Sequence, residues 1–270
     1  MHAFDTAESF DLPDPRVWVA GDWHGSATWV QTVLPALRRR DSLIRTIVHV
    51  GDFWPDDAFA RTVDYWAAKA GIERVLVTLG NHEPYLDITP LQSEHPGKAV
   101  RVSEVVWLLP RPFRFKIMGR DVLSLGGASS VDRHLRTEGL DWWPDELITD
   151  AMEHDAIAGG QADILLTHEA PGADAVPEVQ QLLAGNPYGY PMDTIAVSAA
   201  QRELIDRVRE AVQPEVHFHG HMHVAGERML PSGQRIISLP HDGDVGNVVV
   251  LDVATLDVER LPATALDRRR

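Results

Sequence analysis

Four histidines occupy alternate positions between residues 217 and 223, in the segment HFHGHMH. Alternate side chains of an extended chain point to the same side, so a pair such as His221 and His223 can act together. Imidazole nitrogens are common ligands of divalent transition metals. The chain has no cysteine, so a metal would have to be held by His, Asp, Glu, Asn or water. The segment therefore predicts part of a metal site whose other ligands lie elsewhere in the sequence.

Further donors stand where other short apolar runs end. Asp22 and His24 follow RVWVA, Asp52 follows IVHV, Asn81 and His82 follow VLVTL, and His168 follows ILLT. Open α/β sheets bind ligands at the carboxyl ends of their strands, so we expect these side chains to meet. Carboxylates, an amide and imidazoles suit Mn²⁺, Fe²⁺ or Zn²⁺. So many donors can hold two ions, which together clamp a phosphoryl group for in-line displacement.

Each of these residues also has a structural interpretation. A lone histidine at a strand end is usually a hydrogen bonder, and Asn81 could be a turn residue. Asp22 and Asp52 could cap the helices that follow them. We favour metal ligation because the complete set of donors is present, each after its own apolar run.

The neighbouring polar residues are assigned supporting roles. His217 and His49 are expected to be hydrogen-bonded core histidines, whereas His219 either orients a ligand or faces the phosphate. Glu83 and Glu169 are expected either to orient ligands or to be structural groups, and not to bind a metal themselves, because a ligating imidazole needs its second nitrogen held in place.

The elements that must position these donors alternate along the chain. Buried strands are predicted within 16–25, 45–54, 74–83, 121–130, 162–171 and 215–223, and helices over 26–40, 56–71 and 198–213. Strand followed by helix indicates parallel βαβ units. Hairpin patterns at 113–125 and through the C-terminal third add antiparallel pairs. The predicted fold class is α/β, with two mixed β-sheets packed as a sandwich and flanked by helices in a four-layer α/β/β/α arrangement.

We expect a single domain over residues 1–270, with a short N-terminal extension at 1–15 and a frayed end at 268–270. The segments 128–160 and 172–196 are longer connections near the site. In the first, Arg133 or Arg136 could contact the phosphate of the substrate, or could form surface ion pairs. Trp142 and Trp143 could stack on an aromatic leaving group or a nucleobase, but we favour a role in anchoring this connection to the core. The loop at 185–191 could be a lid or inert.

Composition limits the functional classes. The net charge of −15 repels phosphate backbones, which argues against a general nucleic-acid binder. Bound divalent ions can nevertheless reverse the field inside a cleft. The N-terminus lacks an apolar run and no stretch is long enough to span a bilayer, so the expected location is cytoplasmic, without membrane contact. The sequence leaves the oligomeric state open.

Five of these polar clusters, taken in order, resemble the signature blocks of calcineurin-like metallophosphoesterases. They are GDWHG, GDFW, GNHE, LTHEAP and GHMH, and the resemblance covers about residues 16–250. It implies that Asp22, His24 and His223 bind one metal, and that Asn81, His168 and His221 bind a second. Asp52 would bridge both ions, and His82 would be the general acid for the leaving group. The nucleophile would be a metal-bridging hydroxide.

The resemblance implies a binuclear metal-dependent phosphohydrolase that uses Mn²⁺, iron or Zn²⁺ and acts on small phosphoesters. We favour a phosphodiesterase; the alternatives are a phosphomonoesterase, including a protein serine/threonine phosphatase, and a non-catalytic scaffold. The serine/threonine phosphatase branch usually carries an arginine soon after the second block's aspartate and another just before GNHE. Here the sequence reads GDFWPDDA and LGNHE, so both arginines are missing.

Overall fold

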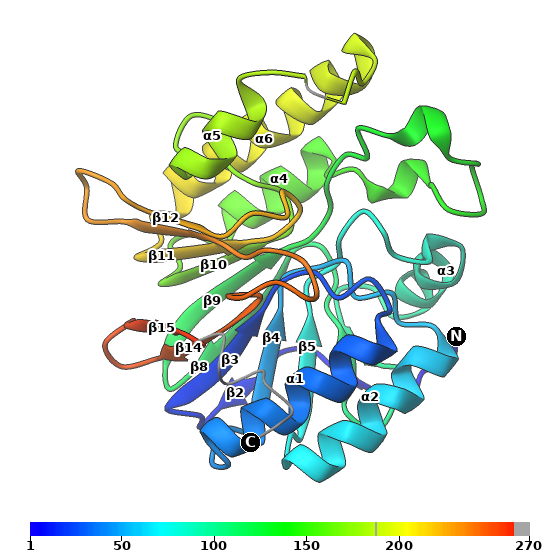
Figure 1. Cartoon of the computed structure of the whole chain (residues 1–270), viewed down its shortest axis with the longest axis vertical. Coiled ribbons are helices and arrows are strands. Elements are labelled where there is room, and N and C mark those ends of the chain that lie inside the picture. Colours follow the sequence, from blue (N-terminus) through cyan, green and yellow to red (C-terminus); the bar gives the residue numbers. More distant parts are fainter. Residues whose placement is uncertain (187, 262–270) are drawn as a thin grey trace.

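The computed structural model describes residues 1–186 and 188–261. Position 187 of the predicted 185–191 loop and the expected frayed end at 268–270 lie outside the described residues. Within the described part, the strands form one eight-stranded and one seven-stranded sheet. Helices cover the outer faces of both sheets (Figure 1).

The first sheet has a parallel centre and antiparallel edges. Its strands in spatial order are β1 (Asp5–Ala7), β6 (Ala99–Arg101), β7 (Val106–Leu108), β5 (Arg74–Val77), β4 (Thr46–His49), β3 (Arg16–Ala20), β14 (Val248–Asp252) and β15 (Val258–Arg260). The strands β3, β4, β5 and β7 run parallel, so their carboxyl ends lie at one edge of the sheet.

The second sheet also has a parallel centre. Its strands in spatial order are β12 (Gly226–Met229), β13 (Arg235–Ser238), β11 (Val216–His219), β10 (Ile164–Thr167), β9 (Arg120–Leu125), β8 (Phe113–Ile117) and β2 (Asp11–Leu12). Here β9, β10, β11 and β13 are parallel. Strand β8 is antiparallel to β9, β12 is antiparallel to β13, and the edge strand β2 is parallel to β8.

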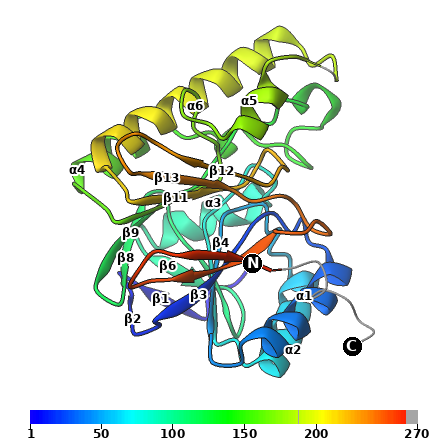
Figure 2. The ribbon, with the colours of Figure 1, turned by 60° about the vertical axis from the view of Figure 1, so that its left-hand side comes forward.

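The six α-helices of the described residues belong to two outer layers and the connections between them. They are α1 (Ala27–Arg40), α2 (Asp57–Ala70), α3 (Tyr85–Glu94), α4 (Asp150–Ala158), α5 (Pro177–Leu183) and α6 (Met192–Val212). Figure 2 shows α1 and α2 at the lower right, beside the first sheet, and α5 and α6 above the second.

Three apolar layers hold this arrangement together. Val48 and Leu76 of the first sheet pack against Leu166 and Phe218 of the second in the central layer. Residues of α1 and α2 pack on the outer face of the first sheet, and residues of α4 and α6 pack on that of the second. The predicted α/β/β/α sandwich is therefore confirmed. Among the described residues, no helix combines the length and the apolarity that crossing a membrane would require.

Local sequence signals account for most element boundaries. The Ser26 hydroxyl accepts a hydrogen bond from Trp29 N at the start of α1, and the Asp56 carboxylate caps α2. Helix α2 stops at Gly71, which takes a left-handed conformation with φ 77°. The hairpin predicted in 113–125 forms from β8 and β9.

Several elements differ from the sequence-based expectation. Residues 1–15, expected to be an extension, supply an edge strand to each sheet through β1 and β2. Helix α6 begins at Met192, six residues before the start predicted from the amphipathic pattern at 198. The expected connections at 128–160 and 172–196 contain α4 and α5. Short strands and helices such as these owe their stability to packing on a neighbouring layer. Because they are short, they show little periodicity in the sequence.

The two sheets approach each other closely where β5 and β9 end. The Gly127 amide donates a hydrogen bond to Leu79 O at 2.7 Å. A Cβ placed on Gly126 would lie 2.7 Å from both the backbone nitrogen and the backbone oxygen of Leu79. Glycine at 126 therefore lets the two strand-end regions touch, which brings the polar clusters of both sheets together.

Gly126→Ala is expected to push the chain away from Leu79, because the colliding atoms are backbone and cannot rotate aside. We expect the free energy of unfolding to fall by about 1–3 kcal/mol in urea denaturation. We also expect faster hydrogen exchange at the Gly127 amide. Gly97→Ala is the control, because its Cβ meets nothing within 4 Å and its cost comes only from φ +72°. Unchanged exchange at Gly127 in the Gly126 variant would contradict the close-contact argument.

Candidate metal centre

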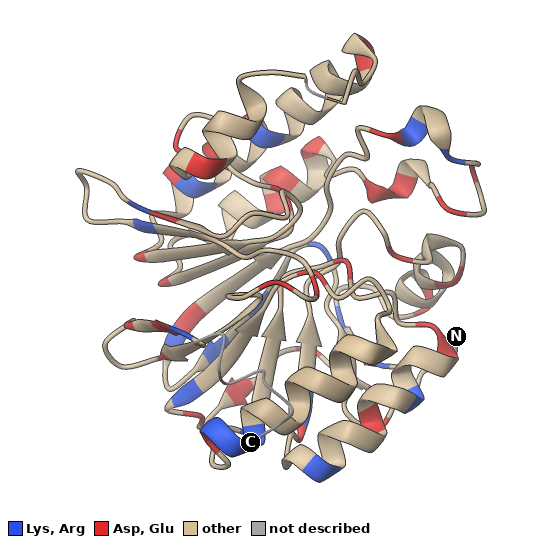
Figure 3. Cartoon of the chain, viewed as in Figure 1, with Lys and Arg blue, Asp and Glu red and all other residues tan. Residues whose placement is uncertain are grey.

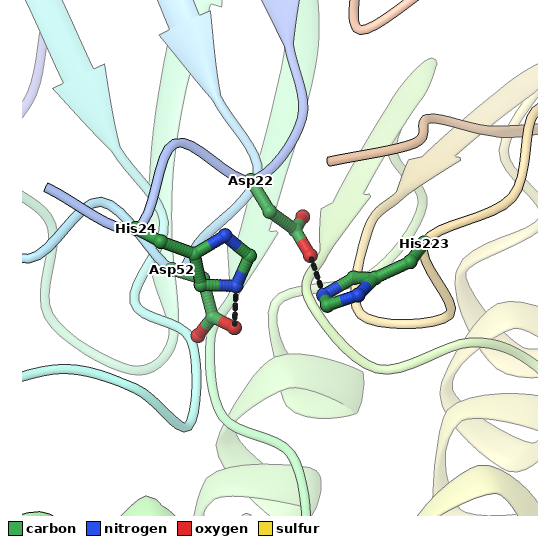
Figure 4. A group of neighbouring side chains, drawn as sticks. All are labelled: Asp22, His24, Asp52 and His223. Atoms are coloured by element: carbon green, nitrogen blue, oxygen red, sulfur yellow. Dashed lines mark ion pairs between the residues drawn. The ribbon is translucent and has the colours of Figure 1, made fainter. Parts of the chain in front are cut away.

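Asp22, His24, Asp52 and His223 converge between the carboxyl ends of the two sheets. Each offers one ligand atom, and these atoms all lie within 4.8 Å of one another. His24 Nε2 is 3.4 Å from Asp52 Oδ2, and His223 Nε2 is 3.2 Å from Asp22 Oδ2. Figure 4 shows the two aspartates and the two imidazoles turned toward a common space. The group joins segments that are about 200 residues apart in sequence.

A second group of donors lies on the other side of Asp52. His168 Nε2 is 3.2 Å from Asp52 Oδ1 and 3.0 Å from Asn81 Oδ1. The second nitrogen of His168 is 2.8 Å from Val50 O, which fixes the orientation of the ring. His221 is close by, with its ring centroid 5.1 Å from that of His168, but its Nε2 lies 3.8 Å from Glu169 Oε2. Asp52 is thus the residue shared by both groups.

The backbone at the site is held in an unusual conformation. His24, Asp52, His221 and His223 have φ of 45°, 54°, 65° and 55°, in the left-handed region that non-glycine residues rarely adopt. Each such residue costs roughly 1–3 kcal/mol, which the surrounding structure must offset. Three of these residues, His24, Asp52 and His223, face the common space, and His221 lies beside His168.

Two glycines let the chain pass close to the aspartates. A Cβ on Gly80 would lie 2.2 Å from Asp52 Oδ1, and a Cβ on Gly220 would lie 2.1 Å from Asp22 Oδ1. Any larger residue would therefore displace a carboxylate. This requirement explains the glycine at the start of GNHE and of GHMH.

Buried polar side chains lock the loops that carry the donors. The Glu83 carboxylate accepts hydrogen bonds from the amides of Phe53, Trp54 and Gly80 at 3.0, 2.8 and 3.1 Å. It thereby ties the loop of Asp52 to the loop of Asn81. The Asn247 side chain holds the loop of Asp22 in a similar way. It donates a hydrogen bond to Asp22 O and accepts hydrogen bonds from the indoles of Trp23 and Trp29.

The electrostatics of the site are dominated by its two aspartates. Burial opposes a charge on His24, but Asp52 and Asp22 more than offset it and raise the pKa of His24 to about 9. Burial also opposes a charge on His168, but the same two aspartates raise the pKa of His168 to about 10. Burial, reinforced by the charge of His168, lowers the pKa of His221 well below its usual value. The site therefore has a strongly negative field that attracts cations.

The donor set fits divalent metal ions. Asp22 and Asp52 are fully buried, and no Lys or Arg nitrogen within the described residues lies within 4.0 Å of them. Asp52 Oδ2 is buried and accepts no hydrogen bond from the described part of the chain. A bound cation stabilises buried carboxylates that have no lysine or arginine beside them. Donor atoms about 3 Å apart, as at His168, suit two ligands of one ion with bonds of about 2.1 Å.

His82 lies at the edge of this centre and contacts Arg136. The backbone amide of His82 donates to Asp52 Oδ1 at 2.7 Å, and its Nε2 is 3.2 Å from Arg136 Nη2. Burial lowers the pKa of His82. The charge of Asp52 opposes this effect, and the charge of Arg136 adds to it. Arg136 also forms two hydrogen bonds with the Asp132 carboxylate, at 2.8 and 2.7 Å. Arg136 therefore contacts the site through His82 and does not itself line the cavity.

The other residues predicted near the site have different surroundings. Arg133 pairs with Asp193 of α6 at 2.9 Å and does not line the cavity at the centre. His219 is fully buried, with Nδ1 3.1 Å from Gly220 O, and burial lowers its pKa to about 4. His217 forms a hydrogen bond with Thr167 in the core. Trp143 packs into the core cluster and contacts Trp54 and Tyr85.

Two supporting contacts were missed from the sequence. Asp242 Oδ1 lies 3.2 Å from His24 Nδ1 and so holds the second nitrogen of that ring. Ser130 Oγ accepts from Asn81 Nδ2 at 3.0 Å, and the buried Glu146 accepts from both the amide and the hydroxyl of Ser130. The segment HDGD held a weak signal for Asp242, whereas Glu146 stands in an unpatterned connection.

Comparison with known proteins defines the class of this chain. The family model "calcineurin-like phosphoesterase" matches residues 15–225. The chain therefore belongs to the calcineurin-like phosphoesterase family, which confirms the resemblance seen in the five sequence blocks and makes it a phosphoric ester hydrolase. The fold and its cluster of donors support divalent metal binding.

Solved structures show the same fold at low sequence identity. The protein TT1561 of Thermus thermophilus aligns with a TM-score of 0.54 and 12% identity, over 92% of this chain and 98% of that chain. A dimetal phosphatase from Danio rerio aligns with a TM-score of 0.53 and 12% identity, over 88% of this chain and 92% of that chain. No curated protein matches the sequence.

Glu83→Ala is expected to lower the free energy of unfolding by roughly 2–4 kcal/mol, because it leaves three buried amides without an acceptor and opens a cavity. The measurement is urea denaturation of the metal-free protein. Glu94→Ala, at the exposed end of α3, is the control and should change stability by less than about 0.5 kcal/mol. Equal effects of the two variants would show that Glu83 does not hold the loops together.

Proposed function

We propose that this protein is a binuclear metal-dependent phosphohydrolase that acts on small phosphoesters, and that phosphodiesters are its preferred substrates. The main support is the position of Asp52, a fully buried carboxylate with one oxygen beside His24 and the other beside His168. A bridging ligand between two ions needs this placement. The proposal assigns the protein to the cytoplasm, in line with the expectation from its sequence.

The proposed ligands divide into two sets. Asp22, His24 and His223 would hold one ion, Asn81, His168 and His221 would hold the other, and Asp52 would contact both. When bound, two divalent ions (Mn²⁺, iron or Zn²⁺) would lower the pKa of water and neutralise charge on phosphate oxygens. Asp242 and Val50 O, which contact the second nitrogens of His24 and His168, keep the two rings aimed at the ions.

His82 is proposed as the general acid. It lines the cavity beside Asp52 and Asn81. Arg136 can only donate a hydrogen bond, so in this contact His82 Nε2 is the acceptor and the ring proton is on Nδ1. Asp132 holds Arg136 in turn, and this chain of contacts fixes the ring. To act as the general acid, the ring would first take up a second proton on Nε2 in place of the Arg136 contact, and as imidazolium it would give a proton to the leaving group and return to neutral imidazole.

Small phosphodiesters are favoured over phosphoproteins and nucleic acids. The arginines typical of the serine/threonine phosphatase branch are missing from GDFWPDDA and LGNHE. The cavity at the centre is about 500 Å³, a size suited to a small molecule. Acidic side chains are spread over the helices and connections of both layers (Figure 3), which does not suit a phosphate backbone.

Elemental analysis of the purified protein should find two divalent ions per chain. After addition of Mn²⁺, bis-p-nitrophenyl phosphate should be hydrolysed faster than p-nitrophenyl phosphate, and removal of the metals with a chelator should abolish both activities. Preference for the monoester would support the phosphomonoesterase alternative. Bound metals without hydrolysis of either compound would support the scaffold alternative.

His82→Ala should reduce kcat by about 10²–10⁴-fold for a dialkyl phosphodiester, because the leaving alkoxide loses its proton donor. Metal content, measured by elemental analysis, should stay near two ions per chain. His154→Ala, on the exposed side of α4, is the matched control and should keep wild-type kcat. Wild-type activity in His82→Ala would refute the assignment of the general acid.

Asp52→Asn should weaken the binding of both ions, because it removes the anionic charge that they share. Asp22→Asn should weaken only one, because Asp22 belongs to one set of ligands. Titration calorimetry with Mn²⁺ on metal-free protein separates these outcomes. Two tight ions in Asp52→Asn would contradict the bridging role.

A further inference from the structure

The cavity at the metal centre is larger than a phosphate group requires. Its volume of about 500 Å³ extends from Asp52 and His82 to the facing ends of α5 and α6. A phosphoryl group held at the metals would occupy only the inner part. The outer part must accommodate the organic portion of the substrate, so its lining reports on the chemistry of that portion.

Much of the outer wall is apolar. Leu182 and Leu183 at the end of α5, Ile195 of α6, and Met222 and Val224 of the loop after β11 line it. Leu183 and Val224 pack against the small apolar cluster between α5 and the second sheet, which gives this wall a fixed position. Such a wall favours a carbon chain or a ring over a strongly hydrated group.

One residue of the outer wall has a different character. Arg202 of α6 is the only lysine or arginine among the described residues that line the cavity. Its exposed fraction is only 9%, and it donates one hydrogen bond, to Ser198 Oγ at 2.6 Å, one turn earlier on the same helix. Ser198 lines the cavity as well.

Arg202 has no ion-pair partner within 4.0 Å in the described part of the chain, although the protein has a net charge of −15. The buried Glu169 is near enough to interact with its charge, but its carboxylate accepts hydrogen bonds from the amides of Ala170 and Ser129. A guanidinium offers five N–H donors, and most of those of Arg202 remain available. A largely buried cation of this kind needs an anionic partner.

We infer that the natural substrate carries a second anionic group, a carboxylate or a phosphate, which binds Arg202 and Ser198 while the apolar wall covers the linker to the scissile phosphate. This inference rests on the proposed hydrolase function, because it assumes that the scissile phosphate lies at the metal centre. A guanidinium matches the planar carboxylate and the phosphate in a two-point contact, which an ammonium group cannot make.

The test uses matched aryl methyl phosphodiesters whose leaving phenol carries a carboxylate at the end of one to five methylenes, and the corresponding neutral carboxamides. We expect wild-type protein with Mn²⁺ to prefer the carboxylate by at least about tenfold in kcat/KM at one spacer length. Arg202→Met should abolish this preference and should hydrolyse the carboxamide within about twofold of wild type. Arg202→Lys should retain part of the preference.

Different outcomes separate the two proposals. Equal rates for carboxylate and carboxamide at every spacer length would overturn the inference, while hydrolysis itself would leave the proposed function intact. Failure to hydrolyse these esters and bis-p-nitrophenyl phosphate would instead refute the proposed function. The inference would also be overturned if Arg202→Met lost activity equally toward the carboxylate and the carboxamide esters with an unchanged melting temperature. Arg202 would then act on the scissile phosphate. Should Arg202→Met fail to fold, the wild-type comparison decides.

Discussion

Two carboxylates, Asp22 and Asp52, are buried at the meeting point of two sheets without a lysine or arginine beside them in the described structure. Removing such charges from water is costly unless a positive charge accompanies them. Three imidazoles, those of His24, His168 and His223, lie within 4.0 Å of them, and Asp52 keeps one oxygen without a hydrogen bond. The rest of the site can be understood as the means of holding this negative centre in place for cations.

Both sheets of the fold contribute to this centre in the same way. The central strands of each sheet are parallel, so the polar turns that follow them lie at one edge of that sheet. The packing of the two sheets places these two edges together. The turns are then fixed to each other by the close contact between Gly126 and Leu79 and by the hydrogen bonds of Glu83 and Asn247. These contacts hold the turns that carry the left-handed residues His24 and Asp52, and the His221 amide, in the third such turn, donates to the Asp22 carboxylate.

The outer parts of the site are supplied by the connections and not by the strands. The 128–160 segment brings Arg136 to His82 and Ser130 to Asn81. The segment from α5 to α6 adds the apolar wall and Arg202, and the Arg133–Asp193 pair joins the two connections. In the proposed function, chemistry at the phosphate depends on the strand ends of the two sheets, whereas selection of the substrate depends on the connections between them.

The sequence by itself determined the α/β/β/α sandwich and a set of candidate ligands, because each donor follows an apolar run and strand ends of parallel sheets meet. Only the tertiary structure decided that Arg133 pairs with Asp193 while Arg136 reaches His82, and that Asp242 and Glu146 support the donors. It also decided that Arg202 faces the cavity. These are contacts between side chains from distant segments, and neither residue spacing nor periodicity encodes them.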